Sequence, residues 1–282
     1  MKCLKEYSSV SGYKLNYTKS EILPLNIQDN SIRALTDPLK WCNNGFKYLG
    51  IQIGKSDAYI FKQNYIKLLE QTKRNLQRWM DLPLSLIGRI NTIKMNILPK
   101  FLYLFQSLSL NVPKSFFKEL NKIITHFIWQ KKNPRVKLIS LQAPYSRGGL
   151  NLPNFRNYYL ASQFRSIWIW LHAENSEVRW VPIEQHEMKS IPLKDAPFIG
   201  TKKCLPTLTN NSITLNTFAA WQESHSLLDT NISFLRGTPL WGNPNLSHHI
   251  TSLTQYYRDG GIETSEQLLI YTLMIHLPTS NN

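Results

Sequence analysis

Three stretches between residues 56 and 132 repeat apolar side chains at three- and four-residue steps, the spacing of an amphipathic helix. The first stretch begins at Ser56 and Asp57, which predict a helix N-cap, and it is broken at "DLPLS" (81–85). The second begins near Ser85 and the third follows Pro113. Three such helices in succession predict a helical bundle, because each must bury one apolar face.

The apolar spacing also predicts which side of each helix is buried. Pro99 is expected to kink or end the second helix, because proline has no backbone N–H. The positions expected inside are Phe61, Tyr65, Leu68, Thr72, Leu76 and Trp79 in the first helix, Leu86, Ile90, Ile93 and Ile97 in the second, and Phe116, Leu120, Ile123 or Ile124, and Phe127 in the third.

Residues 1–55 carry the strand signals. "LKEYSSVSGYKLN" predicts the end of a short helix, a turn at Ser11–Gly12 and a strand, and "SEILPLN" predicts a second short strand that stops at Pro24. "NGFKYLGIQIG" is the strongest strand signal, because aromatic and β-branched residues alternate between bounding glycines. Gly50 inside it predicts a bulge or the close approach of another backbone.

The rest of the chain is less regular. A basic turn, "WQKKNPRVK", precedes a helix that begins near Asn154. We interpret the Trp-rich stripe of this helix as core, with a base-stacking platform as the alternative. The stripe comprises Tyr158, Phe164, Ile167, Trp168 and Leu171. The predicted fold is mainly α with a small β portion, in four segments: 1–55, 56–132, 133–175 and a loosely structured helical tail of unknown role over 176–282.

Positive charge is concentrated in the first part of the chain. Residues 1–160 hold 25 Lys and Arg against 8 Asp and Glu, a net charge of +17, whereas residues 161–282 hold 8 against 10, a net charge of −2. A charge of this size indicates a polyanionic partner. Because aromatic residues are interleaved with the basic ones, nucleic acid is the favoured partner and an ordinary solvated basic surface the alternative.

Composition argues against several other classes. The three cysteines lie far apart and form no CxxC pair, which is typical of reduced thiols in an intracellular protein. No apolar run approaches the roughly 18 residues of a membrane span. The adjacent His248 and His249 have no Cys or carboxylate at zinc-ligand spacing. The choice between nucleus and cytoplasm stays open.

Several long stretches, in this order, resemble the late part of the reverse transcriptases of non-LTR (LINE-type) retrotransposons. They are "SGYKLNYTKSEIL", "FKYLGIQI", "LQRWMDLPLSLIGRINTIKMNILPKFLYLFQ", "PKSFFKELNKIITHFIWQ" and "GGLNLPNF", and they cover roughly residues 1–175. The tail, through "TPLWGNPNL" and "GGIETSEQL", resembles the region after the thumb less specifically.

The resemblance implies that residues 1–55 are the end of a palm with a primer-grip-like hairpin and that residues 56–132 are a thumb. Lys19 matches a lysine near the departing pyrophosphate, although it also suits an exposed strand lysine, and Tyr48 would approach the primer end. The candidate nucleic-acid contacts are Lys14, Lys19, Lys47, Tyr48, Lys73, Arg74, Arg78, Arg89, Lys94, Lys114, Lys118 and Lys122.

The chain departs from the family at the catalytic centre. Such polymerases hold two Mg²⁺ ions with aspartates, including an Asp-Asp pair, and this sequence contains no Asp-Asp pair. The Mg²⁺ would belong to palm aspartates that precede these residues in the family, so we assign this chain no cofactor, no catalytic residue and no small-molecule substrate of its own.

The resemblance leaves three hypotheses about the role of the chain. The chain binds RNA or an RNA–DNA template–primer duplex through phosphates, without base specificity and without catalysis. Alternatively, it contributes to reverse transcription when joined to the missing part, or it is a retrotransposon relic with no function.

Overall fold

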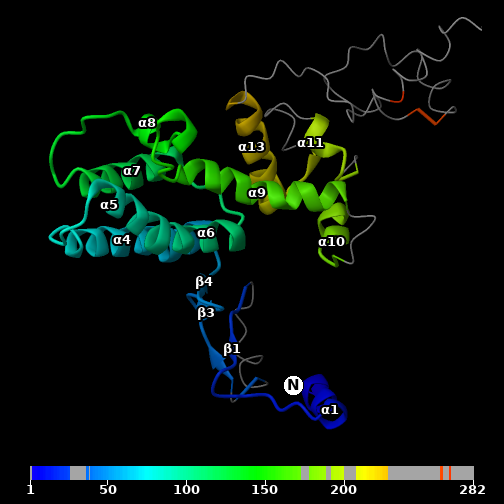
Figure 1. Cartoon of the computed structure of the whole chain (residues 1–282). Coiled ribbons are helices and arrows are strands. Elements are labelled where there is room, and N and C mark those ends of the chain that lie inside the picture. Colours follow the sequence, from blue (N-terminus) through cyan, green and yellow to red (C-terminus); the bar gives the residue numbers. More distant parts are fainter. Residues whose placement is uncertain are drawn as a thin grey trace, which may run out of the picture. The chain divides into compact units, whose positions relative to one another are not determined.

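The computed structural model describes residues 2–25, 36–37, 39–172, 178–188, 192–199, 208–227, 261–262 and 267 (Figure 1). The chain is mainly helical with a small β portion, as the sequence predicted. It forms two compact units: unit 1 comprises residues 1–104 and 112–153, and unit 2 comprises residues 105–111 and 154–282. These units divide the chain differently from the four sequence segments.

The described part of residues 1–41 contains one helix and two short strands. Helix α1 spans Lys2–Ser11 and ends at Gly12, whose φ of 73° is the left-handed conformation common after a helix. The strand expected directly after this turn does not form, and residues 17–19 make another turn. The two short strands are β1 (Glu21–Ile22) and β2 (Lys40–Trp41), which pair in parallel.

The strongest strand signal forms a hairpin rather than one strand. Strand β3 (Phe46–Tyr48) pairs antiparallel with β4 (Ile51–Ile53), so Gly50 lies in the turn and not at a bulge. Leu49 and Gly50 have φ values of 46° and 86°, as in the two-residue turns that suit the twist of a hairpin. The carbonyl of the strained Leu49 accepts a hydrogen bond from the Tyr103 hydroxyl.

The first two predicted helices are long and each contains a π-helical turn. The first comprises α3 (Asp57–Phe61), η1 (Lys62–Ile66) and α4 (Lys67–Arg78), and the second comprises α5 (Leu86–Thr92), η2 (Ile93–Ile97) and α6 (Leu98–Ser107). The hydroxyls of Ser56 and Ser85 cap them by accepting from the backbone N–H three residues on, at 3.3 Å and 3.1 Å. Pro99 does not end the second helix, because the helical chain continues from η2 through α6 to Ser107.

The π-helical turn η1 joins the hairpin to the helix. The side chain of Asn64, in this turn, donates to the carbonyl of Gln52 (2.8 Å) and accepts from its N–H (2.9 Å). Asn64 thereby satisfies both backbone groups of one residue in β4 and is itself buried. A buried asparagine in an apolar stripe is not visible as such in the sequence, so this connection was not predicted.

The core of unit 1 forms where these helices meet α7 (Lys114–Ile128), which is followed by α8 (Leu138–Gln142) and the 3₁₀ turn η3 (Tyr145–Arg147). Tyr65 is fully buried and its ring packs edge-on to Phe116, 5.8 Å between centroids. Most predicted inward positions are buried, including Ile90, Ile93, Ile97 and Leu120. The prediction that Leu86 is buried is wrong: its side chain, in the first turn of α5, is exposed.

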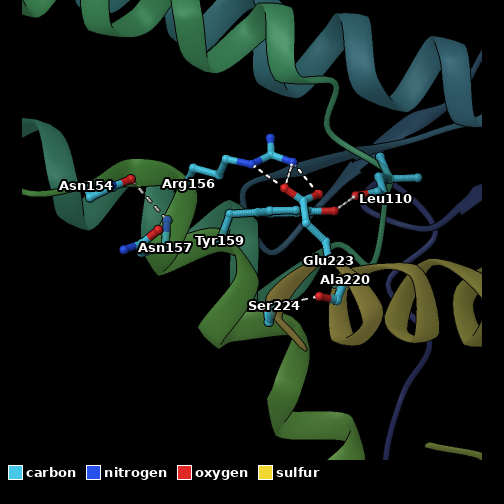
Figure 2. A network of polar contacts seen from close by, with 8 residues as sticks. All are labelled: Leu110, Asn154, Arg156, Asn157, Tyr159, Ala220, Glu223 and Ser224. Atoms are coloured by element: carbon cyan, nitrogen blue, oxygen red, sulfur yellow. Dashed lines mark hydrogen bonds and ion pairs between the residues drawn. The ribbon is translucent and has the colours of Figure 1, made fainter. Parts of the chain in front are cut away.

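Unit 2 is built around α9 (Phe155–Leu171) and α13 (Ser212–Leu227), with the shorter α10 (Val181–His186) and α11 (Ala196–Ile199). Helix α9 begins beside Asn154, as the sequence predicted, and the Asn154 side chain caps it by accepting from the Asn157 N–H. Figure 2 shows the Arg156 guanidinium of α9 on the Glu223 carboxylate of α13, with 2.8 Å between Nε and Oε1. Tyr159 donates to the carbonyl of Leu110 at 2.8 Å (Figure 2).

The Trp-rich stripe of α9 is rotated from the predicted one. Trp170 and Ile167 are buried in the core of unit 2, whereas Trp168 is 63% exposed and stacks on His172. Tyr158 and Leu171 are also exposed, so three of the five predicted core positions are wrong. The stripe was misplaced because α9 is apolar on most sides, which leaves the spacing without a clear polar face. The predicted structure of the tail lies mostly outside the described residues.

Glu184 of α10 gives unit 2 a pH-dependent contact. Its carboxylate accepts from the Trp170 indole at 2.8 Å, and burial raises the pKa of Glu184 above its ordinary value despite this hydrogen bond. A raised carboxyl pKa means that the protonated form favours the folded state, and that this stability is lost as the pH rises through the folded pKa.

Glu184→Gln should therefore raise the melting temperature at neutral pH, because an amide oxygen still accepts from Trp170 without a buried charge. At a pH below the ordinary Glu pKa of about 4.3 the two proteins should melt alike. Thermal unfolding by circular dichroism at both pH values tests this, and a stabilisation that is equal at both would contradict it.

Candidate nucleic-acid interface

Helices α4 and α7 carry two clusters of basic side chains, and the two helices pack against each other in unit 1 (Figure 1). Lys114, Lys118 and Lys122 are spaced by four residues along α7, so they form a row along the helix with steps of about 6 Å. All six side chains of the two clusters are exposed, as the sequence predicted: Lys73, Arg74, Arg78, Lys114, Lys118 and Lys122.

A groove runs between these two helices, and we call it the α4–α7 groove. Its volume is about 230 Å³. Lys73 of α4 and Lys122 of α7 both line it, although they are far apart in the sequence. Its lining residues are Lys73, Leu76, Gln77, Met80, Glu119, Lys122, Ile123, His126 and Phe127.

The groove has an apolar floor and a mainly basic edge. Leu76, Met80 and Phe127 are buried, whereas Lys73, Lys122 and His126 are exposed. Glu119 is the one carboxylate in the lining. This arrangement leaves an excess of positive charge that is exposed to solvent, which suits an anionic backbone better than a neutral ligand.

Most of the basic side chains of the groove region are available to a partner. Ion pairs between described residues include Lys2–Glu6, Lys40–Glu21 and Arg156–Glu223. Lys73, Arg74, Lys118 and Lys122 belong to none of these pairs. Their charges are therefore not neutralised by a neighbouring carboxylate in contact.

Arg89 does not belong to this interface, although the sequence made it a candidate nucleic-acid contact. It is 1% exposed. Its guanidinium donates to four backbone carbonyls: those of Met80, Leu82, Leu84 and Phe127, at 3.2–3.3 Å. It also lies over the Phe127 ring, 5.1 Å from the centroid.

The position of Arg89 has an electrostatic cause. Met80 follows the last turn of α4 and Phe127 lies in the last turn of α7, and helix ends of this kind present carbonyls that carry partial negative charge. A planar guanidinium has enough donors to reach several of these carbonyls at once. Arg89 therefore joins two helix ends instead of contacting phosphate.

Lys94 is also engaged within unit 1. It is half-buried, and its ammonium donates to the carbonyl of Leu150 at 3.2 Å. The same ammonium lies over the ring of Tyr145, 5.3 Å from the centroid. These contacts hold the glycine turn at residues 148–149 near η2, so Lys94 is a weaker candidate for phosphate than the exposed lysines of α7.

The remaining candidates lie in residues 1–55 and do not line the α4–α7 groove. Lys14 and Lys19 are exposed on the segment between α1 and β1. Lys19 lies in a turn, and its backbone N–H donates to the Asn16 side-chain oxygen at 3.1 Å. Lys47 is exposed on β3, and Tyr48 is 58% exposed beside the hairpin turn. The structure therefore separates the predicted contacts into a helical group and an N-terminal group.

Two aspartates of unit 1 lie at the boundaries of helices. Asp57 lies in the first turn of α3, and Asp81 lies in the turn after α4. Among the described residues, no three His, Cys, Asp or Glu side chains come together as ligands. The described residues therefore supply no group of ligands like the two-Mg²⁺ centre of a polymerase.

Comparison with models of known protein families finds no match to this sequence. The resemblance to reverse transcriptases therefore stays a proposal. No helix in the described ranges has both the length and the apolar character needed to cross a bilayer.

Proposed function

We propose that this chain is the thumb-containing part of a non-LTR-type reverse transcriptase and that it binds RNA or an RNA–DNA template–primer duplex through phosphates. The observation that carries the proposal is the α4–α7 groove, where exposed basic side chains of two helices meet without carboxylate partners. In this proposal the chain binds but does not catalyse, because the metal-binding aspartates of such polymerases are not among its residues.

The proposed binding is independent of base sequence. Lysine is a compact charge that attracts phosphate without reading a base edge, and three of the basic residues on α7 are lysines. Contacts of this kind position a protein on a duplex but carry no direct sequence information. The hairpin turn, with Tyr48 and Leu49 exposed, is the proposed contact for the primer end.

The first test is binding of the purified chain to a labelled RNA–DNA hybrid over a range of salt concentrations. We expect log affinity to fall linearly with log salt, at about −0.9 per phosphate neutralised on a duplex, with a slope worth several phosphates. Two hybrids of unrelated sequence should bind alike. Circular dichroism in the same buffer verifies that the protein is folded.

A folded protein that fails to bind at low salt would show that the basic helices are only a solvated surface. A preference for one hybrid sequence would contradict phosphate-mediated binding, because it requires contacts to base edges.

A further inference from the structure

A second cavity lies at the C-terminal end of α7, within unit 1 and apart from most of the basic row. Its volume is about 570 Å³, in the range of ligand sites. It is bounded by the start of α5, the last residue of α7 and the basic turn that follows α7. Its lining residues are Leu84, Leu86, Arg89, Ile128, Trp129, Gln130, Lys132, Asn133, Pro134 and Arg135.

The lining of this cavity combines an aromatic ring, apolar walls and positive charge. Trp129 is half-buried, and the aliphatic side chains Leu84 and Ile128 lie in the same lining. Lys132 and Arg135 are exposed, and the lining contains no carboxylate. Because Arg89 is held by backbone carbonyls, Lys132 and Arg135 are the cations that a ligand would meet.

The backbone at this cavity is held in an uncommon conformation. Gln130 and Lys131 have φ values of 51° and 65°, the left-handed region in which glycine is usual. Two hydrogen bonds hold them: the Gln130 N–H donates to the carbonyl of Phe127 (3.3 Å), and the Lys131 N–H donates to that of His126 (3.1 Å). This is the pattern of a Schellman helix end, here built without glycine, and such strained segments cluster at functional sites.

We propose that this cavity binds an unpaired nucleotide from a single-stranded extension of the duplex. The base stacks on Trp129 against the aliphatic walls, and Lys132 and Arg135 neutralise the adjoining phosphates. Stacking on an aromatic side chain next to basic residues is how proteins hold single strands without sequence preference. An acidic peptide would satisfy the two cations but would leave the Trp129 ring and the aliphatic walls without a planar partner. The inference extends the proposed function to a second contact and rests on it for the duplex.

The test compares a short blunt RNA–DNA hybrid with the same hybrid carrying a short single-stranded RNA extension. Fluorescence anisotropy gives the affinity of each for the wild-type chain and for variants. We expect the extension to raise wild-type affinity about tenfold. Trp129→Ala and the double variant Lys132→Ala/Arg135→Ala should remove this gain and leave blunt-hybrid binding nearly unchanged.

Three variants separate the possible outcomes. Trp168→Ala removes an exposed indole on α9, outside the cavity lining, and should keep the full gain. The double variant changes only exposed side chains, so it tests the cavity even if Trp129→Ala does not fold. Trp129→Phe keeps a stacking ring and should retain most of the gain.

Binding of a short oligoadenylate distinguishes failure of this inference from failure of the proposed function. If the blunt hybrid does not bind but oligoadenylate binds in a Trp129-dependent manner, the cavity stands without the duplex interface. No gain from the extension in the wild-type chain would overturn the cavity proposal, and so would equal loss on both hybrids in the Trp129 variants. Displacement of oligoadenylate by an equal concentration of hexaglutamate would also overturn it, because charge alone would then explain binding.

Discussion

Replacing Arg89 with methionine should lower the free energy of unfolding of the chain by about 3 kcal/mol or more, one of the two largest effects that we expect. Methionine fills a similar volume but donates no hydrogen bond, so the carbonyls of Met80, Leu82, Leu84 and Phe127 would lose their shared donor. Each buried acceptor left unsatisfied costs about 1–3 kcal/mol, although some will be reached by water.

Urea denaturation followed by circular dichroism measures this loss. Arg74→Met is the matched control, because Arg74 is an exposed arginine on α4 and its loss should change stability by less than about 0.5 kcal/mol. Arg89→Lys should recover only part of the stability, since an ammonium lacks the planar fork that reaches both helix ends. A loss for Arg89→Met no greater than that of Arg74→Met would contradict the bridging role of the guanidinium.

The second large effect concerns binding. Lys73→Glu combined with Lys122→Glu should weaken binding of an RNA–DNA hybrid about 100-fold at roughly 50 mM salt and reduce the salt slope by about 2. These two lysines come from different helices and line one groove, so their reversal changes the charge at a single site by four units, from +2 to −2.

Filter binding across a salt series measures both quantities. Lys2→Glu with Lys5→Glu makes the same change in net charge on α1, on exposed residues outside the groove lining, and serves as the control. If the α4–α7 groove is the interface, Lys73→Glu with Lys122→Glu should weaken binding much more than this control. Equal effects of the two double variants would show that only the net charge of the chain matters, and the groove would not be the interface.

Local sequence signals determined where the main helices of unit 1 begin and where its chain is extended. Ser56 was predicted as an N-cap, and a helix was predicted to begin near Ser85. Both hydroxyls satisfy N–H groups that a helix start leaves open, a requirement that acts within three residues. The aromatic and β-branched residues around Gly50 predicted extended chain for the same local reason. The exposed positions of the lysines on α7 also follow from helical spacing alone, since the apolar residues between them fill the opposite face.

Only the tertiary structure decided that Arg89 is buried and which tryptophans of α9 reach solvent. Arg89 has the spacing of a surface arginine, but two helix ends distant in sequence converge on it, and their carbonyls are a stronger attraction than water at that position. Trp168 and Trp170 are indistinguishable in an apolar helix until α13 packs against one side of α9. The α4–α7 groove also depends on tertiary structure. Packing of α4 on α7 brings Lys73 and Lys122 to one groove, and their distance in the sequence does not reveal this.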